Sequence, residues 1–237
     1  MTSLLTVSRL AVSYGAVRAV RDVSLEVEQG ALVTILGANG AGKTSILKAI
    51  MGLQRPASGE VVFDGQVVSG RKPYEIFDLG IATVPENRQV WATMTVEENL
   101  RMGWFKGIGD RQLKVRLAES YDRFPLLSER RRQLAGQLSG GEQQILAFAR
   151  ARMSHPRLIL MDEPSLGLAP KTIQSVFEMV ADACSEGLTI LMAEQNALMA
   201  LRISSGVYVL EHGEVVTSGA PETIAQDESL QRAYLGG

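Results

Sequence analysis

The sequence predicts an α/β fold with a helical segment inserted in its middle. Short apolar runs rich in β-branched residues alternate with stretches of helical periodicity. Strand signals vanish between about residue 95 and residue 156 and resume afterwards. The chain has 237 residues, of which 46% are hydrophobic and 21% charged, so it can bury a sizeable core. We therefore expect a layered α/β core that carries an inserted helical part.

The elements before the insertion follow from hydrophobic periodicity. Apolar–polar alternation predicts a half-exposed strand, and continuous β-branched apolar runs predict buried strands. The Asp64-Gly65 pair inside an alternating segment predicts a hairpin turn. In chain order, the predicted elements are a strand at 23–28, a buried strand at 31–36, a helix at 42–53, a hairpin at 60–68 and a strand at 81–84.

The insertion and the segments after it are predicted in the same way. Thr95 and Glu98 have the spacing of a capping box, which predicts a helix start. His212-Gly213 lies at the expected turn of a second hairpin. The predicted elements are helices at 95–102, 110–124 and 140–153, buried strands at 158–161 and 189–193 with a helix at 170–185 between them, a hairpin at 206–218 and a short helical tail.

Composition excludes several classes of function. The 24 Lys+Arg and 26 Asp+Glu residues give a net charge of −2, which argues against a broad nucleic-acid surface. The longest unbroken apolar runs have five residues, whereas a membrane-spanning helix needs about 20. One cysteine and two histidines leave no internal disulfide and no zinc-type cluster. We expect a soluble chain that does not bind nucleic acid.

A glycine-rich loop follows the buried strand at 31–36. The segment GANGAGKT at 37–44 fits the pattern GxxxxGK[ST] between a predicted strand and a predicted helix. Its glycines let backbone N–H groups approach phosphate oxygens, and Lys43 supplies a charge for the β- and γ-phosphates. A glycine-rich turn without a ligand is the alternative. The predicted nucleotide-binding residues here are Gly37, Ala38, Asn39, Gly40, Ala41, Gly42, Lys43, Thr44 and Ser45, and the hydroxyl of Thr44 is also predicted to bind Mg²⁺.

Two carboxylates follow the buried strand at 158–161. Asp162 is expected at the carboxyl end of that strand, where ligands of open α/β sheets gather, and it is predicted to hold Mg²⁺. Glu163 is then placed to orient and deprotonate an attacking water. The alternative is that both carboxylates cap the next helix. The glycine-rich loop upstream favours a catalytic Glu163 and a phosphate-binding, catalytic Lys43.

The segment LSGGEQ at 138–143 opens a predicted helix, and its serine lies 23 residues before Asp162. The segment resembles the signature of the ATP-binding cassette superfamily, and the resemblance covers essentially the whole chain. It implies one domain over 1–237: a P-loop NTPase (RecA-like) core, an antiparallel β subdomain and an α-helical subdomain inserted at about 87–156. In that family Ser139, Gly140 and Gly141 would face ATP held by a partner cassette, although Ser139 also serves as a helix N-cap.

Other positions follow from the same resemblance. Tyr14 matches the aromatic residue that stacks on adenine, although packing alone could also explain it. Glu86 occupies the place of a usual Gln and would be a Mg²⁺ ligand. Gln195 replaces the usual switch His as a catalytic residue, and Leu168 replaces a usual Asp. Trp91 would either line the groove for the membrane subunits or pack internally.

Several segments point to a subfamily. The segments 84–88, 94–100, 165–170 and 194–196 and the ending at 233–237 resemble the shorter ATP-binding subunit of branched-chain amino acid importers. The resemblance implies ATP hydrolysis at the inner face of the membrane, with a second cassette, two permeases and an external solute-binding protein as partners. The alternatives are a urea or amide importer, a soluble cassette ATPase, and a regulatory nucleotide-binding module without turnover.

Overall fold

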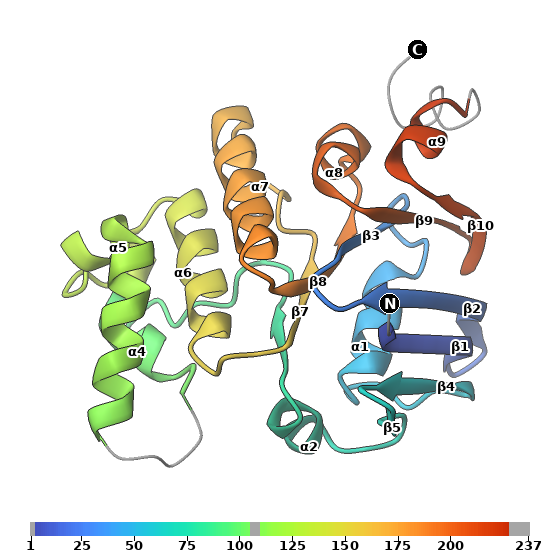
Figure 1. Cartoon of the computed structure of the whole chain (residues 1–237), viewed down its shortest axis with the longest axis horizontal. Coiled ribbons are helices and arrows are strands. Elements are labelled where there is room, and N and C mark those ends of the chain that lie inside the picture. The colour runs from blue at the N-terminus through green and yellow to red at the C-terminus, as the bar shows by residue number, and fades with distance from the viewer. Residues whose placement is uncertain (1–2, 105–109, 228–237) are drawn as a thin grey trace.

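Two sheets of different kinds form the core of the structure, a computed structural model that describes residues 3–104 and 110–227 (Figure 1). The smaller sheet is antiparallel and has the strand order β2-β1-β4-β5. It confirms the antiparallel part that the family resemblance implies. Its strands are β1 (Ser3–Tyr14), β2 (Val17–Glu28), β4 (Ser58–Phe63) and β5 (Gln66–Val67).

The larger sheet has six strands in the order β10-β9-β3-β8-β7-β6. Five of them are parallel, and β10 pairs antiparallel with β9 at one edge. Every residue of β3, β7 and β8 is buried, as expected for strands covered on both faces. The strands are β3 (Leu32–Leu36), β6 (Ile81–Val84), β7 (Leu158–Asp162), β8 (Thr189–Glu194), β9 (Gly206–Glu211) and β10 (Glu214–Gly219).

Helices cover both faces of the larger sheet. α1 (Lys43–Ile50) lies between the two sheets and shares a hydrophobic cluster with both of them. On the other face, apolar residues of α6 (Gly140–Arg152), α7 (Pro170–Ser185) and α8 (Ala197–Ile203) pack against β3, β7 and β8. The short helices α2 (Pro73–Asp78) and α9 (Pro221–Ala225) complete this part.

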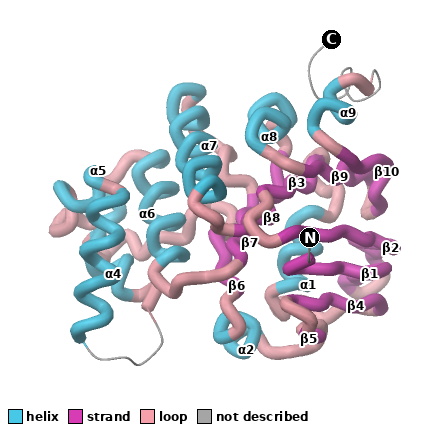
Figure 2. Tube along the Cα trace, viewed as in Figure 1, coloured by secondary structure: helices cyan, strands magenta, loops and turns pink. Residues whose placement is uncertain are grey.

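The insertion between β6 and β7 is helical, as predicted. α3 (Val96–Arg101), α4 (Asp110–Arg123), α5 (Pro125–Glu129) and a 3-10 helix at Ala135–Gln137 precede α6. These elements have a hydrophobic cluster of their own, which includes Val96, Leu127 and Leu146. Figure 2 shows α4, α5 and α6 gathered at one end of the molecule and the antiparallel strands at the other. The subdomain boundary at about 87–156 stays a prediction.

Most predicted elements are present, but β1 and the helices α2, α5 and α8 were not predicted. Both hairpins turn where expected, and Asp64, Gly65, His212 and Gly213 all have positive φ. β1 was not predicted, because a bulge with Arg9 at φ 45° interrupts its alternation. The helix predicted at 42–53 ends at Ile50, because the chain turns there through a left-handed glycine at position 52.

No helix within the described residues is long and apolar enough to cross a membrane. The segment 233–237, which resembles the ending of the importer subunits, lies outside the described residues.

Candidate functional site

The carboxyl ends of β3, β7 and β8 meet at one edge of the larger sheet. Leu36, the last residue of β3, pairs with Glu194 at the end of β8, and Asp162 at the end of β7 pairs with Ala193. The loops that follow these strands carry the predicted phosphate loop, the predicted base Glu163 and the predicted switch Gln195. The fold therefore brings three segments that are far apart in the sequence to the crevice where ligands of parallel sheets bind.

The loop at 37–42 has the backbone form that the motif requires. Gly42 has a φ of 110°, and a Cβ there would lie 2.4 Å from the carbonyl oxygen of Ala19. Any other residue at position 42 would strain or displace the loop. Ala38, Asn39 and Gly40 are exposed, while α1 begins directly after the loop. Exposed backbone at a helix N-terminus is suited to an anion.

Lys43 is almost fully buried, and its ammonium group is held by three oxygen atoms. Its side chain is 3% exposed and forms an ion pair with Glu163, with Nζ 3.0 Å from Oε1. It also donates to the carbonyl oxygens of Gly37 at 2.7 Å and Ala38 at 3.0 Å. An ammonium group has three donors, so a phosphate that binds this lysine must replace one of these oxygens.

The predicted magnesium ligands Thr44 and Asp162 lie side by side. Thr44 Oγ1 donates to Asp162 Oδ1 at 3.0 Å. The pKa of Asp162 is raised to about 6, chiefly by burial and also by the nearby carboxylates of Glu163 and Glu86, against the lowering effects of Thr44 and Lys43. A cation at this point would relieve the cost of the buried negative charge.

The donor set fits a magnesium ion that also binds phosphate. Among the described residues, no group of three or more His, Cys, Asp and Glu side chains is arranged to hold a metal ion. Mg²⁺ is usually bound by one or two protein carboxylates together with substrate phosphates and water. The hydroxyl of Thr44 and the carboxylate of Asp162 suit that mode of binding.

Glu163 and Gln195 flank the crevice from neighbouring loops. Glu163 has a φ of 45° and donates its backbone N–H to the carbonyl of Ala193 at 2.9 Å. Left-handed backbone at a residue other than glycine is costly and gathers at functional sites. Gln195 is exposed directly after β8, and its backbone N–H donates to a carboxylate oxygen of Glu194 at 3.0 Å. The structure thus places both predicted catalytic residues beside the phosphate loop.

Glu86 lies in an irregular loop after β6. It is partly exposed and accepts a hydrogen bond from the side chain of Asn87 at 3.3 Å. Three successive residues, Asn87, Arg88 and Gln89, have positive φ. Asn tolerates this conformation better than most residues. The charge of Glu86 helps to raise the pKa of Asp162.

The signature residues begin α6, in the helical part of the molecule. Ser139 is exposed and forms a capping box: its Oγ accepts from the N–H of Glu142 at 3.4 Å, and the Glu142 carboxylate accepts from the N–H of Ser139 at 2.7 Å. A Cβ on Gly141 would lie 2.1 Å from Cγ2 of Thr172 on α7, so close helix packing also requires this glycine. The role of Ser139, Gly140 and Gly141 toward a partner's ATP stays a prediction.

Tyr14 lies at the end of β1 and is 43% exposed. The exposed ring fits an adenine-stacking role, which stays a prediction. Trp91 is 41% exposed, and the guanidinium of Arg150 lies over its ring, 4.6 Å from the centroid. Arg150 also donates to the carbonyl of Gln89 at 2.8 Å, and burial lowers its pKa. Trp91 therefore packs against Arg150 and still leaves part of its ring exposed, so the structure is compatible with both predicted roles.

Sequence reasoning missed the structural role of Glu194. This carboxylate is fully buried and accepts hydrogen bonds from Ser165, Gln195 and Asn196. The available signal was a charged residue directly after the apolar run at 189–193, in the same position relative to its strand as Asp162.

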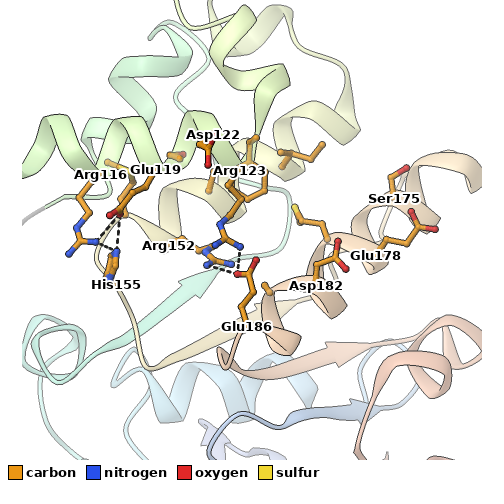
Figure 3. Close-up of a pocket in the computed structure, with 17 residues that line it drawn as sticks. Arg116, Glu119, Asp122, Arg123, Arg152, His155, Ser175, Glu178, Asp182 and Glu186 are labelled. Carbon is orange, nitrogen blue, oxygen red and sulfur yellow. Dashed lines mark hydrogen bonds and ion pairs between the residues drawn. The ribbon is translucent and has the colours of Figure 1, made fainter.

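A cavity of about 870 Å³ lies away from the nucleotide crevice, between α4, α6 and α7 (Figure 3). Arg123 and Arg152 both pair with Glu186 there. Arg116 and His155 both face Glu119. The arginines that line the cavity are therefore each paired with a carboxylate rather than aimed at a ligand.

The geometry of the crevice is that of a P-loop nucleotide site. Comparisons with known proteins show the family. A family model described as ABC transporter matches residues 20–166. The chain belongs to the ABC transporter family and is an ATPase of that family. The resemblance read from the motifs is confirmed, and ATP binding follows from membership.

Curated relatives match over almost their whole length. A high-affinity branched-chain amino acid transport ATP-binding protein of Pseudomonas aeruginosa is 43% identical over 99% of this chain and 100% of its own. A probable branched-chain amino acid transport ATP-binding protein of Archaeoglobus fulgidus is 32% identical over 98% and 99%. The ATP-binding protein of the lipopolysaccharide export system of Haemophilus influenzae is 33% identical over 99% and 98%.

Solved structures show the same fold. A crystal structure of an ATP-binding cassette of an ABC transporter in its ADP conformation has a TM-score of 0.89 and 25% identity, and the match covers 100% of both chains. A dimeric structure of a bacterial ABC transporter cassette has a TM-score of 0.79 and 25% identity over 92% of this chain and 98% of that one. The expected RecA-like core with its inserted helical part is confirmed.

Proposed function

We propose that this chain is the ATP-hydrolysing subunit of an importer of branched-chain amino acids. The observation that carries the proposal is the 43% identity, over essentially both full lengths, to the Pseudomonas aeruginosa protein of that function. The second candidate function is that of an ATP-binding subunit for lipopolysaccharide export, because the relative from that system is 33% identical over a similar length.

In this proposal the triphosphate of ATP lies over the loop at 37–42. The loop's backbone N–H groups, Lys43 and Ser45 would bind phosphate oxygens, and the ring of Tyr14 would stack on adenine. Mg²⁺ would be held by Thr44 and Asp162, with Glu86 nearby, and would neutralise charge on the β- and γ-phosphates. The support is the contact between Thr44 and Asp162 and the raised pKa of the buried carboxyl.

The ion pair between Lys43 and Glu163 joins the predicted phosphate-binding residue to the predicted base. The ammonium of Lys43 holds the Glu163 carboxylate. An incoming γ-phosphate competes for the same ammonium group, which releases Glu163 to accept a proton from an attacking water. Gln195 would donate a hydrogen bond to the γ-phosphate but, unlike a histidine, cannot become charged.

The chemistry implies a partner cassette and membrane subunits. Ser139, Gly140 and Gly141 are directed toward a second ATP held by that cassette, either a sibling subunit or a second copy of this chain. Two permeases would contact the region around Trp91, and an external solute-binding protein would deliver the solute. The proposed location is therefore the inner face of the cell membrane, and the cassette itself never touches the solute.

Uptake of radiolabelled L-leucine by cells that lack this chain tests the proposal. Uptake should fall and should return when the wild-type chain is supplied, but not when Glu163→Gln is supplied. Exposed Glu178→Gln on α7 is a matched control and should restore uptake. Unchanged leucine uptake together with loss of urea or amide uptake, or a defect in lipopolysaccharide export, would contradict the proposed solute.

A further inference from the structure

Glu194 is a buried carboxylate at the end of β8 that no assigned role uses. It is 1% exposed. Its Oε1 accepts from the backbone N–H of Ser165 at 2.9 Å, and its Oε2 accepts from the hydroxyl of Ser165 at 3.0 Å. The same Oε2 accepts from the backbone N–H groups of Gln195 at 3.0 Å and Asn196 at 3.1 Å. Four donors therefore converge on one side chain.

These donors belong to two loops that flank the nucleotide crevice. Ser165 follows the predicted base Glu163 by two residues, and Gln195 is the predicted switch residue. The backbone carbonyl of Glu194 also accepts from the N–H of Gly37, the first residue of the phosphate loop, at 3.3 Å. One residue thus contacts the loop that carries the base, the loop that carries the switch, and the phosphate loop.

The arrangement calls for a carboxylate rather than an amide. Both oxygens of Glu194 act as acceptors, and the donors around them are N–H and O–H groups. In Glu194→Gln one oxygen becomes an amide NH₂ group, which has donors only and opposes either the Ser165 N–H or the two switch-loop N–H groups. A buried donor left without an acceptor is costly, so one of the two loops would have to move.

We propose that Glu194 is a positioning residue, which ties the Ser165 loop to the Gln195 loop and thereby fixes Gln195 relative to Glu163 across the crevice. The proposal rests on the proposed ATP hydrolysis at this site. It places Glu194 behind the reacting groups and not among them. Burial raises its pKa, while the four donated hydrogen bonds lower it. The position of the switch therefore depends on the acceptor geometry of one side chain.

Glu194→Gln in the full chain tests the proposal through ATP hydrolysis with Mg²⁺ present. The turnover number kcat should fall about tenfold or more, because misplaced catalytic groups are costly, while KM should change less than about twofold, because the phosphate loop is intact. Ser165→Ala removes only the hydroxyl donor and should give a smaller fall in kcat. The double variant should lose less than the product of the two single losses, because both changes remove part of one linkage.

Hydrogen exchange supplies a readout that does not depend on turnover. The amides of Ser165, Gln195 and Asn196 should exchange faster together in Glu194→Gln, while binding of ADP stays unchanged. Thr34→Val is the control, since it removes the hydrogen bond at 2.7 Å between buried Thr34 on β3 of the same sheet and Ser204 at the end of α8. The control should leave kcat and these three amides as they are in the wild type.

Two outcomes would overturn the positioning role. One is a Glu194→Gln protein that melts earlier but keeps wild-type kcat per folded molecule. The other is faster exchange at Ser165 with no change at Gln195 and Asn196. If Glu194→Gln does not fold, an unchanged kcat in Ser165→Ala has the same meaning. A wild-type chain that binds ATP without hydrolysing it refutes the proposed function instead, and the exchange data still decide whether Glu194 joins the loops.

Discussion

The phosphate loop at 37–45 and the signature at 139–141 both place glycine backbone at a helix N-terminus, yet they differ in what surrounds them. Around the phosphate loop, polar and charged groups that follow two strands, β3 and β7, contact one another: Lys43 pairs with Glu163, and Thr44 donates to Asp162. Around the signature, the hydrogen bonds described for Ser139 all stay within its own helix. The first site is nearly complete within one chain, whereas the second is open on its exposed side.

The difference between the two sites separates what the parallel sheet contributes from what the helical part contributes. In the proposed function, the parallel sheet supplies buried positions for the groups that would bind phosphate and activate water. The helical part would supply exposed donors that gain a ligand only when another molecule brings one. Substitutions in the phosphate loop should therefore act on a single chain, and substitutions in the signature should act only on an assembly.

The largest effect is expected for Glu163→Gln. Removing the predicted general base should lower the rate of ATP hydrolysis about 10²- to 10⁴-fold while ATP binding is retained. Release of phosphate from ATP measures the rate, and equilibrium dialysis measures the binding. Glu178→Gln, an exposed change on α7, should have the wild-type rate. Hydrolysis at the wild-type rate in Glu163→Gln would rule out this residue as the base.

Lys43→Ala should weaken ATP binding about tenfold to 100-fold, because it removes charged hydrogen bonds to phosphate. Isothermal titration calorimetry on the nucleotide-free chain measures the dissociation constant. An unchanged dissociation constant would show that the loop at 37–45 is not the phosphate site.

Asp162→Asn should stabilise the nucleotide-free protein at neutral pH. The pKa of Asp162 rises from 3.8 to about 6 on folding. Between those values the folded state holds more protons than the unfolded state, so the wild type loses stability as pH rises through that window. Above pH 6 the free energy of unfolding should be greater by about 1–3 kcal/mol in Asp162→Asn. Chemical denaturation at pH 7.5 and pH 4 measures the gain, which should disappear at the lower pH.

A gain in stability that persists at pH 4 would contradict the electrostatic origin of this effect. Added Mg²⁺ and ATP should reverse the order, because the wild type binds the complex more tightly and is stabilised by it.

Ser139→Ala is expected to have the smallest effect on a single chain. It removes the N-cap of α6 and should lower the free energy of unfolding by about 1 kcal/mol. Binding of ATP to the isolated chain should not change, whereas hydrolysis by the assembled pair of cassettes should fall. Thermal unfolding and calorimetry measure the two single-chain quantities. If Ser139→Ala weakened ATP binding to the single chain as much as Lys43→Ala does, the signature would also bind ATP of its own chain, and the contrast between the two sites would be wrong.

The sequence predicted the sites that depend on local pattern. The strand–loop–helix order around Lys43, the carboxylates after the strand at 158–161 and the capping box of Thr95 and Glu98 follow from near neighbours. β1 was missed because a bulge at Arg9 breaks its alternation, so apolar residues on either side read as out of phase. Residues that act across the fold, such as Glu194, were also missed. Ser165, which contacts its side chain, lies 29 residues away in the sequence, Gly37, which contacts its backbone, lies farther still, and only the strand order brings them together.

A crystal structure of Glu163→Gln with Mg²⁺ and ATP, in the presence of the partner cassette, tests the central contrast most directly. The phosphates should lie over the loop at 37–45, with the metal on Thr44 and Asp162. The γ-phosphate should meet a signature serine from the other cassette. A nucleotide bound by Lys43 and Ser139 of the same chain, or phosphates bound away from the 37–45 loop, would contradict the account.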